Sequence, residues 1–102
     1  MSRLEQLHKL RQADPDDADV RYMLAQEHAK LGDADAALAA YDECLALDPD
    51  YHYAYFHKAR VFETEGQTDE AVATLRAGLE RAQAAGATKA VNEIAGYLDE
   101  LT

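Results

Sequence analysis

Apolar side chains return every three or four residues along most of the chain, which is the spacing that places them on one face of an α-helix. This spacing predicts a helix from about residue 18 whose apolar positions reach Leu31, followed by Gly32 as a left-handed turn residue. A second helix, capped by Asp33 or Asp35, is expected to run to a stop at Asp48–Pro49. The first half of the chain is therefore predicted to fold as helix, tight turn and helix.

The second half of the chain shows the same order of elements. A helix is expected from about His52 to Glu65, and Gly66 ends it. Thr68 or Asp69 is expected to cap the next helix, which continues to about Ala85. The two halves thus predict two helix pairs of the same kind.

Two further apolar stripes flank these helix pairs. Leu4, Leu7 and Leu10 precede Asp14–Pro15, and they predict a short helix at the start of the chain. At the other end the apolar positions of a last helix are Val91, Ile94, Ala95, Leu98 and Leu101, with Asn92, Glu93, Asp99 and Glu100 on its opposite face. With almost no β-type alternation, the sequence predicts an all-α protein of about six helices.

An internal repeat appears when the chain is offset by 34 residues. The offset pairs turn residues and small residues, namely Pro15 with Pro49, Ala25 with Ala59, Gly32 with Gly66 and Ala37 with Ala71. We expect the small side chains to let the helix backbones approach closely.

The repeat also predicts the organisation of the chain. A single domain is expected, with repeats over residues 18–51 and 52–85, a capping helix over 1–14 and another over 87–102.

The residues at these positions resemble a known repeat pattern, W-x2-L-G-x2-Y, then A-x3-F, then P. The first unit reads Arg21-x2-Leu24-Ala25-x2-His28, then Ala37-x3-Tyr41, then Pro49. The second unit reads Tyr55-x2-Lys58-Ala59-x2-Phe62, then Ala71-x3-Leu75. The chain is thus similar to the tetratricopeptide repeat family. It departs from the family pattern at Arg21, His28, Lys58 and Gly78, and it has Gln83 in place of the second closing proline.

The resemblance implies a right-handed superhelix of antiparallel helix hairpins, an α-solenoid, with a concave groove that holds a peptide or a partner protein. The groove would be lined by the first helix of each unit. The groove positions carried over from the family are Tyr22, Gln26 and Lys30 in the first unit, and Tyr53, Phe56, Arg60 and Glu63 in the second. The paired Lys and Asn side chains with which some family members grip a C-terminal carboxylate are replaced by Tyr22 and Gln26 in the first unit.

Helical spacing independently places Tyr53, Phe56, Arg60 and Glu63 on one helix face. The face with Ala59 is assigned to the core. Five of the eight aromatic residues fall between residues 51 and 62, and two interpretations of this cluster stay open. The rings either pack between adjacent repeats or form an exposed platform for a partner, with Arg60 binding an anion or a carbonyl group.

The charge of the chain limits its partners. Twenty acidic and ten basic residues give a net charge of −10, which disfavours nucleic acids and anionic membrane surfaces. No stretch predicts a secretory signal or a membrane-spanning helix, and the single cysteine excludes an internal disulfide, so a cytoplasmic protein is expected.

No catalytic, metal or cofactor motif is found in the sequence. The four histidines, His8, His28, His52 and His57, lack the spacing of metal ligands, and Cys44 lies on an apolar helix face, where an inert thiol is expected. We therefore expect a non-catalytic interaction module, a scaffold or adaptor that is monomeric or weakly dimeric. The alternative is a self-assembling structural protein that dimerises through its end helices, by exposure of Leu4, Leu7, Val91 or Leu98.

Overall fold

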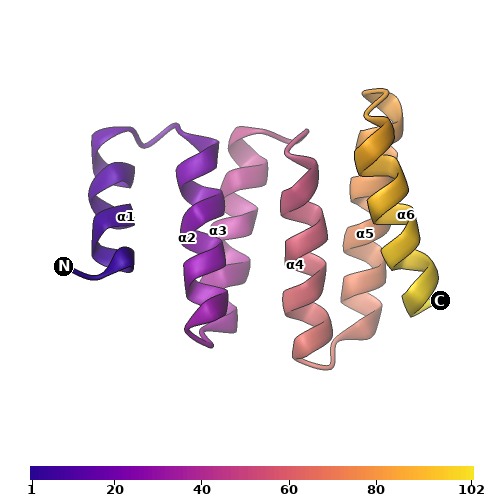
Figure 1. The fold of residues 1–102 in the computed structure, drawn as a ribbon, viewed down its shortest axis with the longest axis horizontal. Coiled ribbons are helices and arrows are strands. Elements are labelled where there is room, and N and C mark those ends of the chain that lie inside the picture. The colour runs from indigo at the N-terminus through magenta and orange to yellow at the C-terminus, as the bar shows by residue number, and fades with distance from the viewer. The chain divides into compact units, whose positions relative to one another are not determined.

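Six α-helices and no strand make up the computed structural model, which describes residues 1–102 (Figure 1). The helices are α1 (Arg3–Ala13), α2 (Ala18–Lys30), α3 (Ala34–Leu47), α4 (His52–Thr64), α5 (Thr68–Ala84) and α6 (Thr88–Leu101). The predicted all-α class and the predicted order of helices are confirmed. None of these helices combines the length and the apolar character that crossing a membrane requires.

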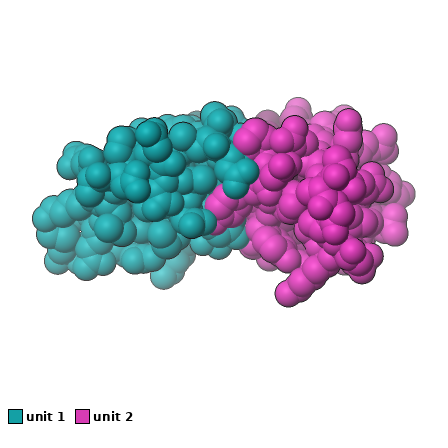
Figure 2. Space-filling view, turned by 90° about the horizontal axis from the view of Figure 1, so that it is seen from above, with its two compact units in different colours: residues 1–48 teal, residues 49–102 magenta.

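The chain divides into two compact units, residues 1–48 with α1, α2 and α3, and residues 49–102 with α4, α5 and α6 (Figure 2). In the first unit α2 packs on α3 and on α1. In the second unit α5 packs on α4 and on α6, and α4 also contacts α6. That the two repeats and their flanking helices form a single domain stays a prediction.

Side-chain caps start the helices of the first unit. The carboxylate of Asp17 accepts from the Asp19 amide at 2.9 Å, and that of Asp33 accepts from the Ala36 amide at 3.1 Å. These bonds satisfy amides that have no partner in the first turn of a helix. The prediction of Thr68 or Asp69 as the cap of α5 is wrong. The N-cap residue is Gln67, which makes no side-chain cap bond. Asp69 instead lies in the first turn, where its negative charge interacts favourably with the helix dipole.

Glycine ends the first helix of each hairpin, as predicted. Gly32 has φ 81° and Gly66 has φ 76°, a region where a Cβ is strained. The chain reverses direction at each glycine, and the next residue makes the same capping hydrogen bond in both units. The Asp33 amide donates to the His28 carbonyl at 2.9 Å, and the Gln67 amide donates to the Phe62 carbonyl at 2.8 Å.

Alanines make the close helix contacts in both units. The four predicted small residues, Ala25, Ala37, Ala59 and Ala71, are all fully buried. In the second unit the buried core consists of Ala59, Ala71, Leu75, Ala82, Ala90, Ile94 and Tyr97. The small side chains thus pack at the helix interfaces while Leu75, Ile94 and Tyr97 fill the remaining volume.

The exposure of several apolar residues differs from what the sequence predicts. Leu31 is exposed because α2 ends at Lys30, so Leu31 lies beyond the apolar face of the helix. Leu10 is exposed as well, because the backbone of α1 lies close to that of α2 only and Leu7 is the buried residue of α1. The expected exposure of Leu7 is therefore wrong, whereas Val91 and Leu98 are partly buried against the core of the second unit. Less apolar surface is left for self-assembly than the sequence suggested.

Arg21 and Tyr55, which stand at the same position of the two repeats, make the same hydrogen bond with different donors. The Nη2 of Arg21 donates to the carbonyl of Pro15 at 2.6 Å, and the hydroxyl of Tyr55 donates to the carbonyl of Pro49 at 2.8 Å. Both acceptors are the prolines that lie 34 residues apart. Arg21 thus makes the hydrogen bond that the aromatic residue Tyr55 makes in the second repeat, although arginine has no ring.

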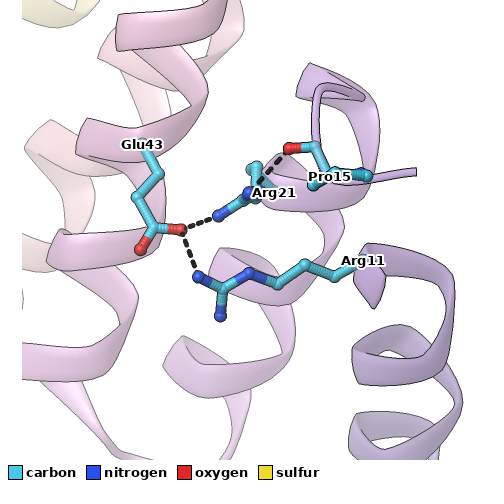
Figure 3. A network of polar contacts seen from close by, with 4 residues as sticks. All are labelled: Arg11, Pro15, Arg21 and Glu43. Atoms are coloured by element: carbon cyan, nitrogen blue, oxygen red, sulfur yellow. Dashed lines mark hydrogen bonds and ion pairs between the residues drawn. The ribbon is translucent and has the colours of Figure 1, made fainter. Parts of the chain in front are cut away.

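The guanidinium of Arg21 also joins an ion-pair network in the first unit (Figure 3). Its Nη1 donates to the carboxylate of Glu43 on α3, and Arg11 on α1 approaches the same Oε2 atom at 3.4 Å. Only 12% of the Arg21 side chain is exposed, against 40% for Arg11 and 42% for Glu43. One carboxylate thus pairs with a largely buried cation and a more exposed one.

Candidate functional site

A pocket of about 440 Å³ opens within the second unit between α4 and α6. On the α4 side its lining residues are Phe56, Arg60 and Glu63. These three residues lie at spacings of three and four along the helix, so they share a face of α4. The sequence had assigned this same face to partner binding.

The opposite wall of the pocket comes from α6. Its lining residues are Asn92, Glu93, Gly96, Tyr97 and Glu100. A Cβ added at Gly96 would have no atom within 4 Å, so the middle of this wall is open space.

Two aromatic rings form the apolar part of the pocket. The ring centroids of Phe56 and Tyr97 are 5.1 Å apart, with their planes inclined by 56°. Tyr97 is only 8% exposed, and its hydroxyl donates to Glu63 Oε1 at 2.8 Å. Burial, and then the hydrogen bond and the charge of Glu63, raise the pKa of Tyr97, so the phenol stays protonated and keeps donating. The hydrogen bond thereby fixes the Tyr97 ring of α6 against α4.

Carboxylates outnumber cations among the side chains that line the pocket. Arg60 is the one cation, whereas Glu63, Glu93 and Glu100 contribute three carboxylates. Arg60 also affects its neighbour His57, whose pKa is lowered from 6.5 by burial and then by the charge of Arg60.

The structure thus brings three of the predicted binding residues together, Phe56, Arg60 and Glu63. Tyr53 lies one turn earlier on α4 and is half-buried, and it is not part of the pocket lining.

The other predicted residues, Tyr22, Gln26 and Lys30, lie on α2 in the first unit. The Tyr22 ring packs edge-on against Tyr41 with centroids 6.0 Å apart, and the Gln26 amide donates to the Tyr22 hydroxyl at 3.3 Å. Lys30 is exposed at the last residue of the helix.

The sequence reasoning missed the α6 wall, because it treated this helix as a cap with a polar outer face. The signal that reveals it is a third copy of the repeat pattern, Val91-x2-Ile94-Ala95-x2-Leu98. This copy is out of step with a strict 34-residue period, since α6 begins at residue 88, 36 residues after α4 at residue 52. With the corrected offset Asn92 corresponds to Phe56 and Gly96 to Arg60, two positions that the family resemblance assigns to the predicted groove.

No group of three or more His, Cys, Asp or Glu side chains is arranged to hold a metal ion. Of the histidines, His8 and His28 pack in a T-shaped arrangement with ring centroids 6.2 Å apart.

We expect the Cys44 thiol to resist alkylation while the protein is folded. The side chain is fully buried, and burial, followed by the charges of Asp48 and Asp19, raises its pKa to about 12. On the order of one thiol in ten thousand is then ionised at about pH 8, and only the thiolate is nucleophilic. Mass spectrometry after iodoacetamide treatment, with and without urea, measures this protection. Equally fast labelling in both conditions would contradict the burial of Cys44.

The family model of the tetratricopeptide repeat matches the chain over residues 4–43 and again over residues 22–87. Together these matches span most of the chain, so the protein belongs to the tetratricopeptide repeat family. The resemblance inferred from the turn glycines and small residues is therefore confirmed.

Solved structures agree with this assignment. A tetratricopeptide repeat domain protein from Salinibacter ruber is 38% identical, with a TM-score of 0.80 over 86% of this chain and 89% of that one. The TPR2B domain of yeast Sti1, solved in a complex with pHsp70, has a TM-score of 0.87 at 21% identity, covering 96% of this chain and 78% of that one. PcrH in complex with the chaperone binding region of PopD also has a TM-score of 0.87 at 21% identity, covering 96% and 74%. At this lower identity the last two structures show the shared fold alone.

Proposed function

We propose that this protein is a non-catalytic interaction module that binds an extended peptide or a segment of a partner protein. The observation that carries the proposal is the pocket between α4 and α6, where Phe56, Arg60 and Glu63 line one wall. Concave sites that combine an aromatic surface with a few polar groups are typical of binding sites, and Tyr and Arg are enriched where binding energy concentrates.

The structural relatives support this reading. Sti1 TPR2B was solved with pHsp70, and PcrH was solved with a region of PopD, so two proteins of this fold hold polypeptide partners. Tyr22, Gln26 and Lys30 on α2, with Tyr53 on α4, are the further residues that we propose for partner contact. The acidic surface supports a protein partner over a nucleic acid.

The Phe56→Ala/Arg60→Ala double variant tests the site. Removing both side chains should weaken binding at least tenfold, because truncation of central interface residues commonly costs more than 1 kcal/mol each. The helical signal should stay nearly unchanged, since Arg60 is exposed and Phe56 lies at the edge of the core. Peptides selected from a displayed random library on the immobilised protein serve as ligands, and calorimetry measures their affinities.

A matched control removes one apolar and one cationic side chain outside the pocket. Leu31 and Arg76 are both exposed and neither lines the pocket, so Leu31→Ala/Arg76→Ala should bind as the parent does. Unchanged affinity in the Phe56→Ala/Arg60→Ala variant would place the binding site on another face.

A further inference from the structure

The rim of the pocket carries more negative than positive charge. Arg60 is the only cation among its lining residues, and Glu63, Glu93 and Glu100 oppose it. The Tyr97 hydroxyl already engages Glu63, whereas the carboxylates of Glu93 and Glu100 take part in no hydrogen bond or ion pair within the chain. Two acidic groups of α6 therefore remain available to a ligand.

These two carboxylates flank a gap in the helix surface. Glu93, Gly96 and Glu100 follow one another at three and four residues, so they share one face of α6. The two glutamates are two turns apart, about 10 Å along the helix axis. Because nothing lies within 4 Å of a Cβ built at Gly96, an extended side chain has room to lie between them.

The aromatic rings complete a surface that fits a long cationic side chain. The methylene groups of lysine or arginine pack on apolar surface while the charged end reaches a carboxylate, and both cations are attracted to ring faces. Phe56 and Tyr97 provide such rings, with centroids 5.1 Å apart.

We propose that the pocket between α4 and α6 takes a lysine or arginine side chain of the partner, so that the protein selects basic segments. This inference rests on the proposed function and names the chemistry of its ligand. Glu93 and Glu100 bind the cationic end, the rings contact the methylene groups, and Arg60 donates to carbonyl oxygens of the partner's main chain. A carboxylate at the same place would face three acidic side chains. The net charge of −10 on the whole chain further attracts basic segments.

Four capped peptides of one length test the preference, Gly-Ala-Leu-X-Ala-Leu-Gly with lysine, arginine, glutamine or glutamate at X. Nuclear magnetic resonance titration of the isotope-labelled protein gives their affinities and locates the perturbed amides. We expect lysine and arginine to bind about fivefold to tenfold more tightly than glutamine, and glutamate to bind most weakly. The preference should shrink as salt rises, since partly exposed charges are screened. The perturbed amides should include Gly96 and Phe56.

Three variants separate the pocket from the overall charge. Glu93→Gln/Glu100→Gln should abolish the preference for lysine over glutamine. The control Glu80→Gln/Asp99→Asn removes the same charge from exposed positions outside the pocket, and it should keep the preference. Gly96→Leu keeps every charge but fills the gap, so it should weaken binding of all four peptides.

Any of the following results would overturn the inference. An equal loss of preference in both carboxylate variants would assign it to the whole-molecule charge, and tighter binding of the glutamate peptide would make the pocket an anion site. Equal binding of all four peptides, or no binding by any at millimolar concentration, also rejects a cation pocket. The proposed function fails separately, when the random library yields no peptide that binds the immobilised protein. Selected peptides that keep their affinity for the Phe56→Ala/Arg60→Ala variant would instead place the binding site on another face.

Discussion

Replacing Gly78 by alanine will destabilise the protein, although alanine is the better helix former. The added Cβ would lie 2.5 Å from the Tyr55 Cβ and 2.8 Å from its Cγ, distances that real Cβ atoms essentially never show. Because a Cβ is tied to its own backbone, relief requires α4 and α5 to move apart. Such overpacking costs about 1–3 kcal/mol, which outweighs the gain of up to about 1 kcal/mol in helix propensity.

Gly96 provides the matched control for this substitution. It also lies within a helix, but a Cβ there would meet nothing within 4 Å. Gly96→Ala should therefore stabilise the protein by up to about 1 kcal/mol, because only the propensity changes. Urea unfolding followed by circular dichroism gives both free energies of unfolding. Gly78→Ala as stable as the parent would show that Tyr55 and Gly78 are not in close contact.

This contact also explains a departure from the family pattern. Gly78 corresponds to Cys44 in the first repeat, and Tyr55 corresponds to Arg21. The contact with the Tyr55 Cβ and Cγ leaves no room for a side-chain carbon at residue 78, so glycine stands there. Repeat alignment alone reveals that Gly78 departs from the pattern but not the reason, because the contact with Tyr55 depends on the distance between two helices.

The sequence predicted the helices well because local physics decides them. Apolar spacing and the turn glycines Gly32 and Gly66 act within a few residues, so their positions mark the helix ends directly. The α4 side of the pocket was predictable for the same reason, since Phe56, Arg60 and Glu63 share a face by spacing alone.

The α6 side of the pocket depends on packing between distant segments. The hydrogen bond between Tyr97 and Glu63 joins residues 34 positions apart, and no local pattern marks either residue as a partner of the other. The longer α5, 17 residues against 14 in α3, also shifted α6 away from the strict repeat period. In the sequence Gly96 is only a residue of low helix propensity within a helix, and the structure shows the open space beside it.

Glu43→Ala should destabilise the first unit by about 2 kcal/mol. The substitution leaves the Arg21 guanidinium, 12% exposed, with the Pro15 carbonyl as its acceptor, while its Nε is already buried without a partner (Figure 3). Losing one member of a buried ion pair costs about 3–5 kcal/mol, and the 42% exposure of Glu43 reduces this because water reaches the site. Arg11→Ala removes the more exposed ion pair of the same network, so it should lower the free energy of unfolding by less than about 1 kcal/mol.

A double variant identifies the cause of this loss. If Glu43→Ala acts by leaving a largely buried charge unpaired, then Arg21→Met/Glu43→Ala should recover part of the stability, since methionine fills similar volume without a charge. The free energies of unfolding of the parent, both single variants and the double variant form a cycle that yields the coupling between the two side chains. Strictly additive losses would mean that Glu43 acts through α3 alone, and that Arg21 is held by the Pro15 carbonyl, the same interaction that Tyr55 makes with Pro49 in the second repeat.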